Sequence, residues 1–108
     1  MFIVLMAAAL AGATPVAPNA GDARCAAVFA VLVSGSEGDV QKGVINGLLY
    51  YIGKLKGRDP SASIEAQLRA GSQGDSKAFE ADKTRCLAEF TQVGEEMSKA
   101  GAAMQANP

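Results

Sequence analysis

The apolar residues of this sequence form a run at the start of the chain and four later segments, which polar, glycine-containing turns separate. Residues 23–33 are apolar nearly all round after Arg24, as in a helix that is buried on most sides, although the β-branched residues of Val28–Val33 also suit a strand. Residues 40–56 repeat apolar side chains at the three- and four-residue spacing of one helix face. The pattern therefore predicts two helices in the first half of the chain.

The second half of the sequence predicts a short helix and a long one. A helix that begins at Pro60 and ends at Gly71 would bury Ile64 and Leu68, and a longer helix covers residues 76–103. The long helix carries one apolar stripe, formed by Phe79, Cys86, Phe90, Val93, Met97 and Met104. We expect the two methionines of this stripe to fill the core, and the alternative is that they form an adaptable apolar groove. The fold class that follows is all-α, a small bundle of about four helices.

Helix starts are marked by aspartates, whose short carboxylates can accept the free backbone N–H groups of a first turn. Asp22, Asp39 and Asp59 each precede one of the first three predicted helices. We therefore expect these three residues to be N-caps.

The apolar run at the start of the chain has the pattern of a secretory signal peptide. It is followed by Ala11-Gly12-Ala13, a small-residue site of the A-x-A type. No Lys or Arg precedes the run, so a start codon assigned too late and an uncleaved anchor remain alternatives, although the run has about half of the ~20 residues that span a membrane. The expected organisation is a signal peptide (1–13), a flexible mature N-terminus (14–21), a helical domain (22–104) and a loose tail (105–108). The expected location is periplasmic or secreted, with no stable membrane insertion after cleavage.

The chain has two cysteines, Cys25 and Cys86. An even cysteine count in a short exported chain is normally a disulfide framework. A redox pair would more often be a C-x-x-C motif, and two thiolates without histidine leave a zinc site short of ligands. We therefore predict a Cys25–Cys86 disulfide that joins the first helix to the last, with no metal and no cofactor.

The charges exclude some classes of function. Ten basic and eleven acidic residues give a net charge of −1, and the chain has no histidine. Interspersed charges of both signs do not make the basic face of a nucleic-acid-binding protein. Without histidine the usual general base is missing, and no catalytic or nucleotide-binding motif stands out. These observations favour a protein that is not an enzyme.

One group of residues is a candidate interaction surface near the end of the second predicted helix. It consists of Tyr50, Tyr51, Lys54, Lys56 and Arg58. Adjacent residues on a helix point about 100° apart, so one tyrosine is expected inward and the other at the surface. The alternative for the three cations is that they complement the helix dipole and keep the protein soluble.

Three segments carry a resemblance: Cys25-Ala-Ala-Val-Phe29, the run from Gly47 to Pro60, and Thr84-Arg-Cys86. With them the chain resembles small exported two-cysteine helical envelope proteins of unassigned function. In size, single long-range bridge and helical content it is also loosely similar to the acid-stress periplasmic chaperones. The resemblance implies an envelope protein and no particular site residue.

Two functional hypotheses follow. The first is a non-enzymatic envelope protein, a binding or stress-protective module whose partner is another protein or unfolding clients. Near pH 2 its eleven carboxylates would be protonated, and charge repulsion would then loosen the bundle and expose apolar faces to clients. The alternative is a structural or assembly subunit, such as a homodimer formed through Gly43 and Gly47, or an inhibitor-type partner of another envelope protein.

Overall fold

The computed structural model describes residues 18–107, which form four α-helices and no strand. The helices are α2 (Pro18–Ser34), α3 (Gly38–Arg58), α4 (Ile64–Gly71) and α5 (Ser76–Ala106). This architecture confirms the predicted all-α class, and the alternative strand over 28–33 is wrong because that segment continues α2. The predicted signal peptide (1–13) lies outside the described residues.

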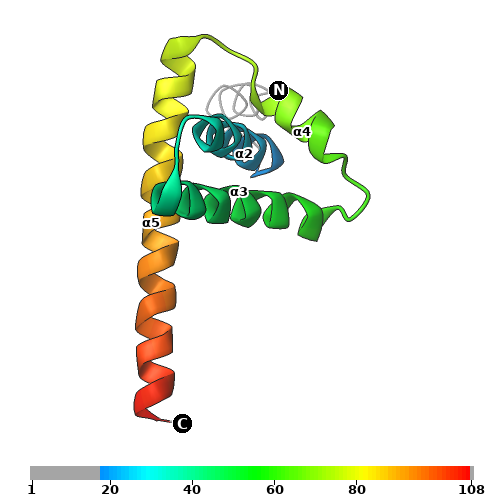
Figure 1. Cartoon of the computed structure of the whole chain (residues 1–108). Helices are drawn as coiled ribbons and strands as arrows, with labels where there is room; N and C mark the ends of the chain where they lie inside the picture. Colours follow the sequence, from blue (N-terminus) through cyan, green and yellow to red (C-terminus); the bar gives the residue numbers. More distant parts are fainter. Residues whose placement is uncertain (1–17, 108) are drawn as a thin grey trace, which may run out of the picture.

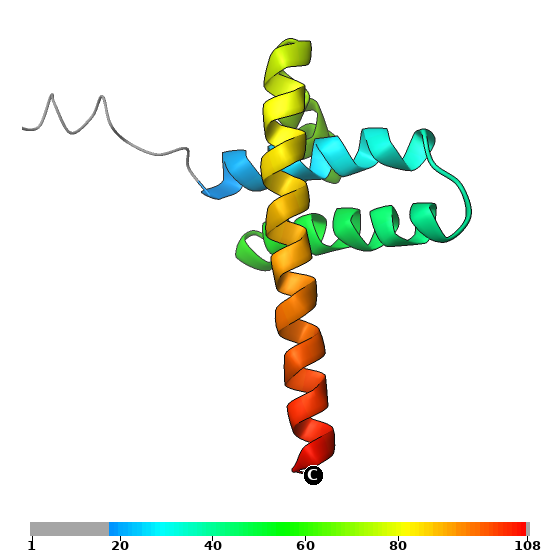
Figure 2. The ribbon, with the colours of Figure 1, turned by 90° about the vertical axis from the view of Figure 1, so that its left-hand side faces the viewer.

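Helix α2 is the centre of the molecule, because it packs against each of the other three helices. Figure 1 shows α3, α4 and α5 arranged around it on three sides. Figure 2 shows α2 and α3 as an antiparallel pair that α5 crosses at a steep angle. A helix surrounded in this way must be apolar around most of its circumference, and this is the pattern of its sequence.

Small residues let the neighbouring helices approach α2 closely. A Cβ atom added at Gly71 of α4 would overlap the backbone carbonyl of Ala23, and one added at Gly47 of α3 would overlap the ring of Phe29. Gly43, by contrast, has open space around it. Gly47 therefore serves packing within the chain and is not available to a dimer face formed with Gly43.

The core is built around aromatic rings from three helices. Phe29 of α2 stacks on Tyr51 of α3 with ring centroids 5.6 Å apart, and it meets Phe90 of α5 edge-on at 5.4 Å. Tyr50 also contacts Phe90, at 5.9 Å. The buried cluster consists of Ala23, Cys25, Ala26, Phe29, Tyr51, Leu55 and Cys86. Because its members come from α2, α3 and α5, this cluster holds the three helices together.

The starts of the first two helices differ from the prediction. Helix α2 already begins at Pro18, so part of the segment expected to be a flexible N-terminus is helical and Asp22 lies inside the helix. Helix α3 begins at Gly38, one residue before the predicted cap, and its N-cap residue Glu37 makes no capping side-chain bond. Proline suits a first helical position because its missing N–H would have no partner there.

The two later helices begin after true side-chain caps. The N-cap of α4 is Ser63, whose Oγ accepts the N–H of Ala66 at 3.2 Å. Asp59, the predicted cap, instead accepts the N–H of Ser61 at 3.1 Å in the preceding turn. The start predicted for α5 is confirmed, and Asp75 caps it by accepting the N–H of Ala78 at 2.9 Å. The predicted start at Pro60 is therefore wrong for α4, because the turn takes the aspartate that was expected to cap it.

Helix α5 is much longer than the part of it that packs. It continues to Ala106, so residues 105 and 106, which were expected in a loose tail, are helical. Both views show its second half extending away from the other helices to the C-terminus (Figures 1 and 2). We call this half, residues 91–106, the arm.

Candidate functional site

The disulfide is the covalent link between the central helix and α5. Cys25 and Cys86 are both fully buried, with their sulfur atoms 2.05 Å apart and their Cα atoms 5.4 Å apart. This bridge confirms the predicted pairing. Neither cysteine is free, so neither offers a thiol for redox chemistry or metal binding in this state.

A cluster of charged side chains surrounds Asp22, which is only 6 % exposed. One carboxylate oxygen of Asp22 lies 3.0 Å from Lys54 Nζ, and the other pairs with the guanidinium of Arg58. Arg58 also donates to the side-chain oxygen of Asn19 at 2.6 Å. A buried carboxylate requires such partners, because an unpaired charge in the interior is strongly unfavourable. Asp22 therefore ties α2 to the last two turns of α3.

Tyr51 connects this cluster to the disulfide. Its hydroxyl lies 3.2 Å from the backbone oxygen of Cys86 and 3.1 Å from Glu89 Oε1, and it donates to these acceptors. The same Glu89 oxygen lies 3.7 Å from Lys54 Nζ. The three helices α2, α3 and α5 are thus joined by polar contacts directly beside the bridge.

A second set of ion pairs lies on the outer side of the same junction. Asp82 of α5 lies 3.6 Å from Arg24 of α2 and 3.6 Å from Arg85 of its own helix. Arg85 also approaches Glu89, at 3.8 Å, and donates to the backbone oxygen of Gly21 at 3.4 Å. These contacts are longer and more exposed than those of Asp22, so we expect each to contribute little on its own.

The environment of the cluster shifts two pKa values. Burial, reinforced by the nearby Glu89 carboxylate, raises the pKa of Tyr51 above its usual value. Burial alone would lower the pKa of Lys54, but the hydrogen bond and the charge of Asp22 outweigh it and raise this pKa. Both groups therefore stay protonated to a higher pH than usual, which suits a structural role better than proton transfer near neutral pH.

The five residues of the candidate interaction surface are brought together only in part. Tyr51 is fully buried, as expected for one of the two tyrosines. Tyr50 is half-buried and packs against Phe90, so it reaches the surface only in part. Lys54 and Arg58 are engaged by Asp22, and Lys56 donates to the backbone oxygen of Pro60 at 2.8 Å. These side chains are occupied with contacts inside the chain, so they do not form a free basic surface.

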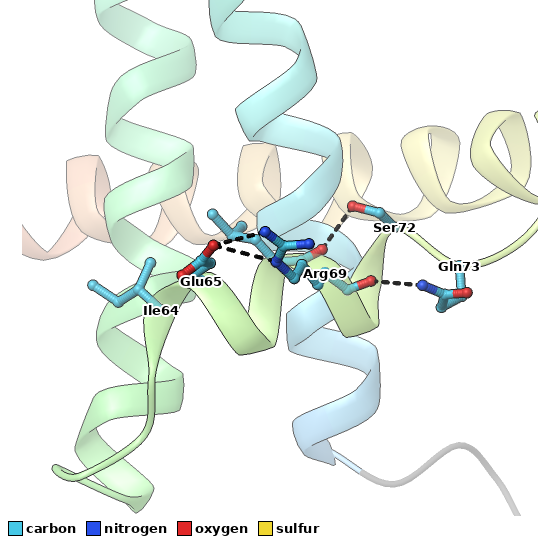
Figure 3. Close-up of a pocket in the computed structure, with 6 residues that line it drawn as sticks. Ile64, Glu65, Arg69, Ser72 and Gln73 are labelled. Atoms are coloured by element: carbon cyan, nitrogen blue, oxygen red, sulfur yellow. Dashed lines mark hydrogen bonds and ion pairs between the residues drawn. The ribbon is translucent and has the colours of Figure 1, made fainter.

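A shallow hollow lies on α4 and the turn after it (Figure 3). It is lined by Ile64, Glu65, Leu68, Arg69, Ser72 and Gln73. Arg69 turns back to Glu65 at 2.8 Å, and Ser72 and Gln73 donate to backbone oxygens of α4 (Figure 3). The polar groups of the hollow thus satisfy one another, and no nucleophile–base pair faces into it.

In the part of the chain that the structure describes, the arm is a helical segment that extends beyond the other helices. Val93 is half-buried, and every other residue of the arm is exposed. Met97 and Met104 are 69 % and 72 % exposed, so the expectation that they fill the core is wrong. The periodicity of the sequence correctly placed them on the stripe of Phe90. The periodicity did not reveal that this stripe extends beyond the other three helices.

Comparison with protein-family models, curated proteins and solved structures finds no match to this chain. Within residues 18–107, none of the helices is long and apolar enough to cross a membrane. In the same part of the chain, no group of three or more His, Cys, Asp or Glu residues is placed to hold a metal ion.

Proposed function

We propose that this chain is a non-enzymatic, exported interaction protein. Its disulfide-stapled body, residues 18–90, presents the arm to a protein partner. The observation that carries this proposal is the arm itself, a helix whose apolar stripe continues past the packed body with Met97 and Met104 exposed. Exposed apolar side chains that are grouped on one face are typical of interaction sites, whereas scattered ones are not. Methionines are common on surfaces that adapt to their partners.

Export is supported by the buried disulfide as well as by the apolar leader of the sequence. Structural disulfides persist in oxidising compartments and are rare in the cytosol. The pairing of the charged residues around Asp22 supports a structural role for that cluster. In this proposal the body holds the arm in a fixed position.

The proposal is tested by placing a photo-crosslinking amino acid on the arm in living cells. At position 97, on the apolar stripe, we expect a discrete cross-linked species in the cell envelope after illumination. At position 95, on the opposite face of the same helix, we expect none. If neither position yields a cross-linked species of any kind, the arm has no partner and the proposal fails.

A second candidate function is stress-protective binding of unfolding proteins. It is favoured by exposed apolar residues on the α2–α3 hairpin, namely Val31, Val40, Ile45 and Leu49. The test is suppression of client aggregation near pH 2 by the oxidised protein at an equimolar ratio. If aggregation proceeds at the same rate with and without the protein, this second function is excluded.

A further inference from the structure

The stripe of the arm has the spacing of a helix pair. From Phe90 onward its members are Phe90, Val93, Met97, Ala100 and Met104, which alternate steps of three and four residues. This alternation is the seam of two helices that pack along each other. Phe90, at the start of the seam, packs against Phe29 and Tyr50. The later members Met97, Ala100 and Met104 are exposed. The seam is therefore filled at its start and open over the arm.

We propose that the partner of the arm is the arm of a second copy of this chain, packed antiparallel to it. This inference rests on the proposed function and specifies the partner. It is argued from the sizes of the seam residues, from the charges beside the seam and from the length of the arm.

The seam is complementary to itself when one copy is reversed. If Met97 faces Ala100 of the second copy, then Val93 faces Met104 along the same seam. Each methionine then meets a smaller side chain, and such alternation of large and small residues lets facing layers interdigitate. A parallel pair in register would instead place methionine against methionine and alanine against alanine.

The charges of the arm also favour the antiparallel orientation. Glu96 and Lys99 lie on one side of the stripe, and Gly94 and Gly101 lie on the other. In an antiparallel pair the two charged sides share one edge, so Glu96 of each copy lies about 3 Å along the axis from Lys99 of the other. A parallel pair would place Glu96 beside the glycine side, which carries no charge. Among the described residues, no ion pair engages Glu96 or Lys99 within the chain.

The register fits the length of the arm. The pairing of Met97 with Ala100 places the twofold axis between residues 98 and 99, which is the midpoint of residues 91–106. The contact therefore spans the whole arm, about 24 Å of helix, and leaves the two bodies at opposite ends. The glycines on the uncharged edge have no side chain to keep the backbones apart. One helix pair is a small interface, so we expect a weak dimer with a Kd in the range of about 1–100 µM.

The first experiment is sedimentation equilibrium of the oxidised protein, purified from the cells that make it, over a concentration range that brackets this Kd. We expect a reversible rise from monomer to dimer mass. The double variant M97E/M104E should raise the dimer Kd at least about 100-fold, since it places charges in the seam. The control T91E/A102E adds the same charge on the outer face and should leave the Kd within about twofold. A mass that stays monomeric at about 1 mM, or a dimer that is unaffected by M97E/M104E, would overturn the inference.

A charge exchange tests the orientation. E96K alone and K99E alone should each weaken self-association about tenfold, because each places like charges together along the shared edge. An equimolar mixture of the two variants should restore association, since every facing pair is then opposite in sign. If the mixture associates no better than either variant alone, the antiparallel arrangement is wrong.

Failure of this inference differs from failure of the proposed function. If the purified protein is monomeric while position 97 cross-links to a different protein in the envelope, the arm is a docking site for another partner and self-pairing is wrong. If position 97 gives no cross-linked species and the purified protein is also monomeric, both proposals are wrong.

Discussion

Single residues decide how closely the helices of this protein approach one another. The clearest case is Gly71, where α4 meets the backbone of α2 and a Cβ would overlap the carbonyl of Ala23. Backbone cannot move aside as a flexible side chain does. The glycine is therefore required by the crossing of the two helices, although glycine is normally unfavourable within a helix.

We predict that Gly71→Ala destabilises the protein by about 1–3 kcal/mol, because the new methyl group forces α4 away from α2. The control is Gly53→Ala in α3, where nothing lies within 4 Å of the added Cβ. That substitution should stabilise the helix by up to about 1 kcal/mol. Thermal unfolding of the two variants should therefore shift in opposite directions from the wild type. Equal shifts of the same sign would contradict the close contact at Gly71.

A second residue-scale prediction concerns Tyr51 at alkaline pH. Burial raises the pKa of Tyr51 in the folded protein, whereas the unfolded chain titrates near 10.0. The folded state therefore keeps this proton when the unfolded state has lost it, so the contribution of Tyr51 to stability is constant below about pH 10 and is lost above it. In Tyr51→Phe this contribution is absent, and the melting temperature should fall less between pH 9 and pH 11. Lys54, whose pKa is also raised from 10.5, should retain part of the decline in the variant. An equally steep decline in Tyr51→Phe would contradict the assignment.

The same residues show where reasoning from sequence stops. The disulfide follows from the cysteine count, and helical spacing indicates that one of two adjacent tyrosines points inward without showing which. The role of Asp22 does not follow from the sequence, because a carboxylate near a helix start is equally suited to capping that helix. Its ion pairs with Lys54 and Arg58 depend on the packing of α2 against α3, which brings together residues distant in the sequence.

At the scale of elements, α5 combines two different environments in one continuous helix. Its first half is fixed to the body by Cys86 and Phe90 and by the ion pairs of Asp82. Within residues 18–107 its second half has no contact of this kind, yet it continues a helix that is already nucleated. The periodicity of the sequence predicted the stripe of α5 correctly. It could not predict which part is covered, since coverage depends on the lengths and directions of the other helices.

We predict that removing residues 95–108 leaves the body intact. This truncation keeps Val93, the half-buried residue of the arm, and removes only exposed ones from the helix. At concentrations well below the proposed dimer Kd, the free energy of unfolding should change by less than about 1 kcal/mol, and helix content should fall by about the length removed. Denaturant unfolding followed by circular dichroism measures both quantities. A loss of several kcal/mol would show that the arm supports the body, contrary to its exposure.

Hydrogen exchange gives a further prediction for the arm. In dilute monomer the amides of residues 95–106 should exchange much faster than those of residues 80–90, because the end of an unsupported helix opens readily. If the arms pair, this exchange should slow as the protein concentration rises. In M97E/M104E it should remain fast at every concentration. Strong protection of the wild-type arm in dilute solution would contradict its lack of contacts.

At the scale of the whole molecule, α2 is the helix against which the other three pack. The disulfide determines how strongly α5 is held against it. The α2–α3 contact contains stacked aromatic rings and the ion pairs of the buried Asp22. Helix α4 packs closely against α2 at Gly71. Helix α5 meets α2 over a shorter stretch, because it crosses the α2–α3 pair steeply (Figure 2). A bridge at this crossing therefore secures the helix that has the shortest contact with α2.

We predict that Cys25→Ala/Cys86→Ala lowers the free energy of unfolding by about 4 kcal/mol, since the bridge closes a loop with a sequence separation of 61 residues. A typical domain has about 5–15 kcal/mol in total, so a large share of the stability would be lost. The weakly packed α5 should detach first, and Tyr51 then loses its acceptors on that helix, Cys86 and Glu89. Urea unfolding, followed by tyrosine fluorescence and by circular dichroism, should therefore give two separate transitions in the variant and one in the wild type. A single transition with a loss below about 1 kcal/mol would show that packing alone holds α5 in place, and the bridge would then not be what keeps the arm mounted on the body.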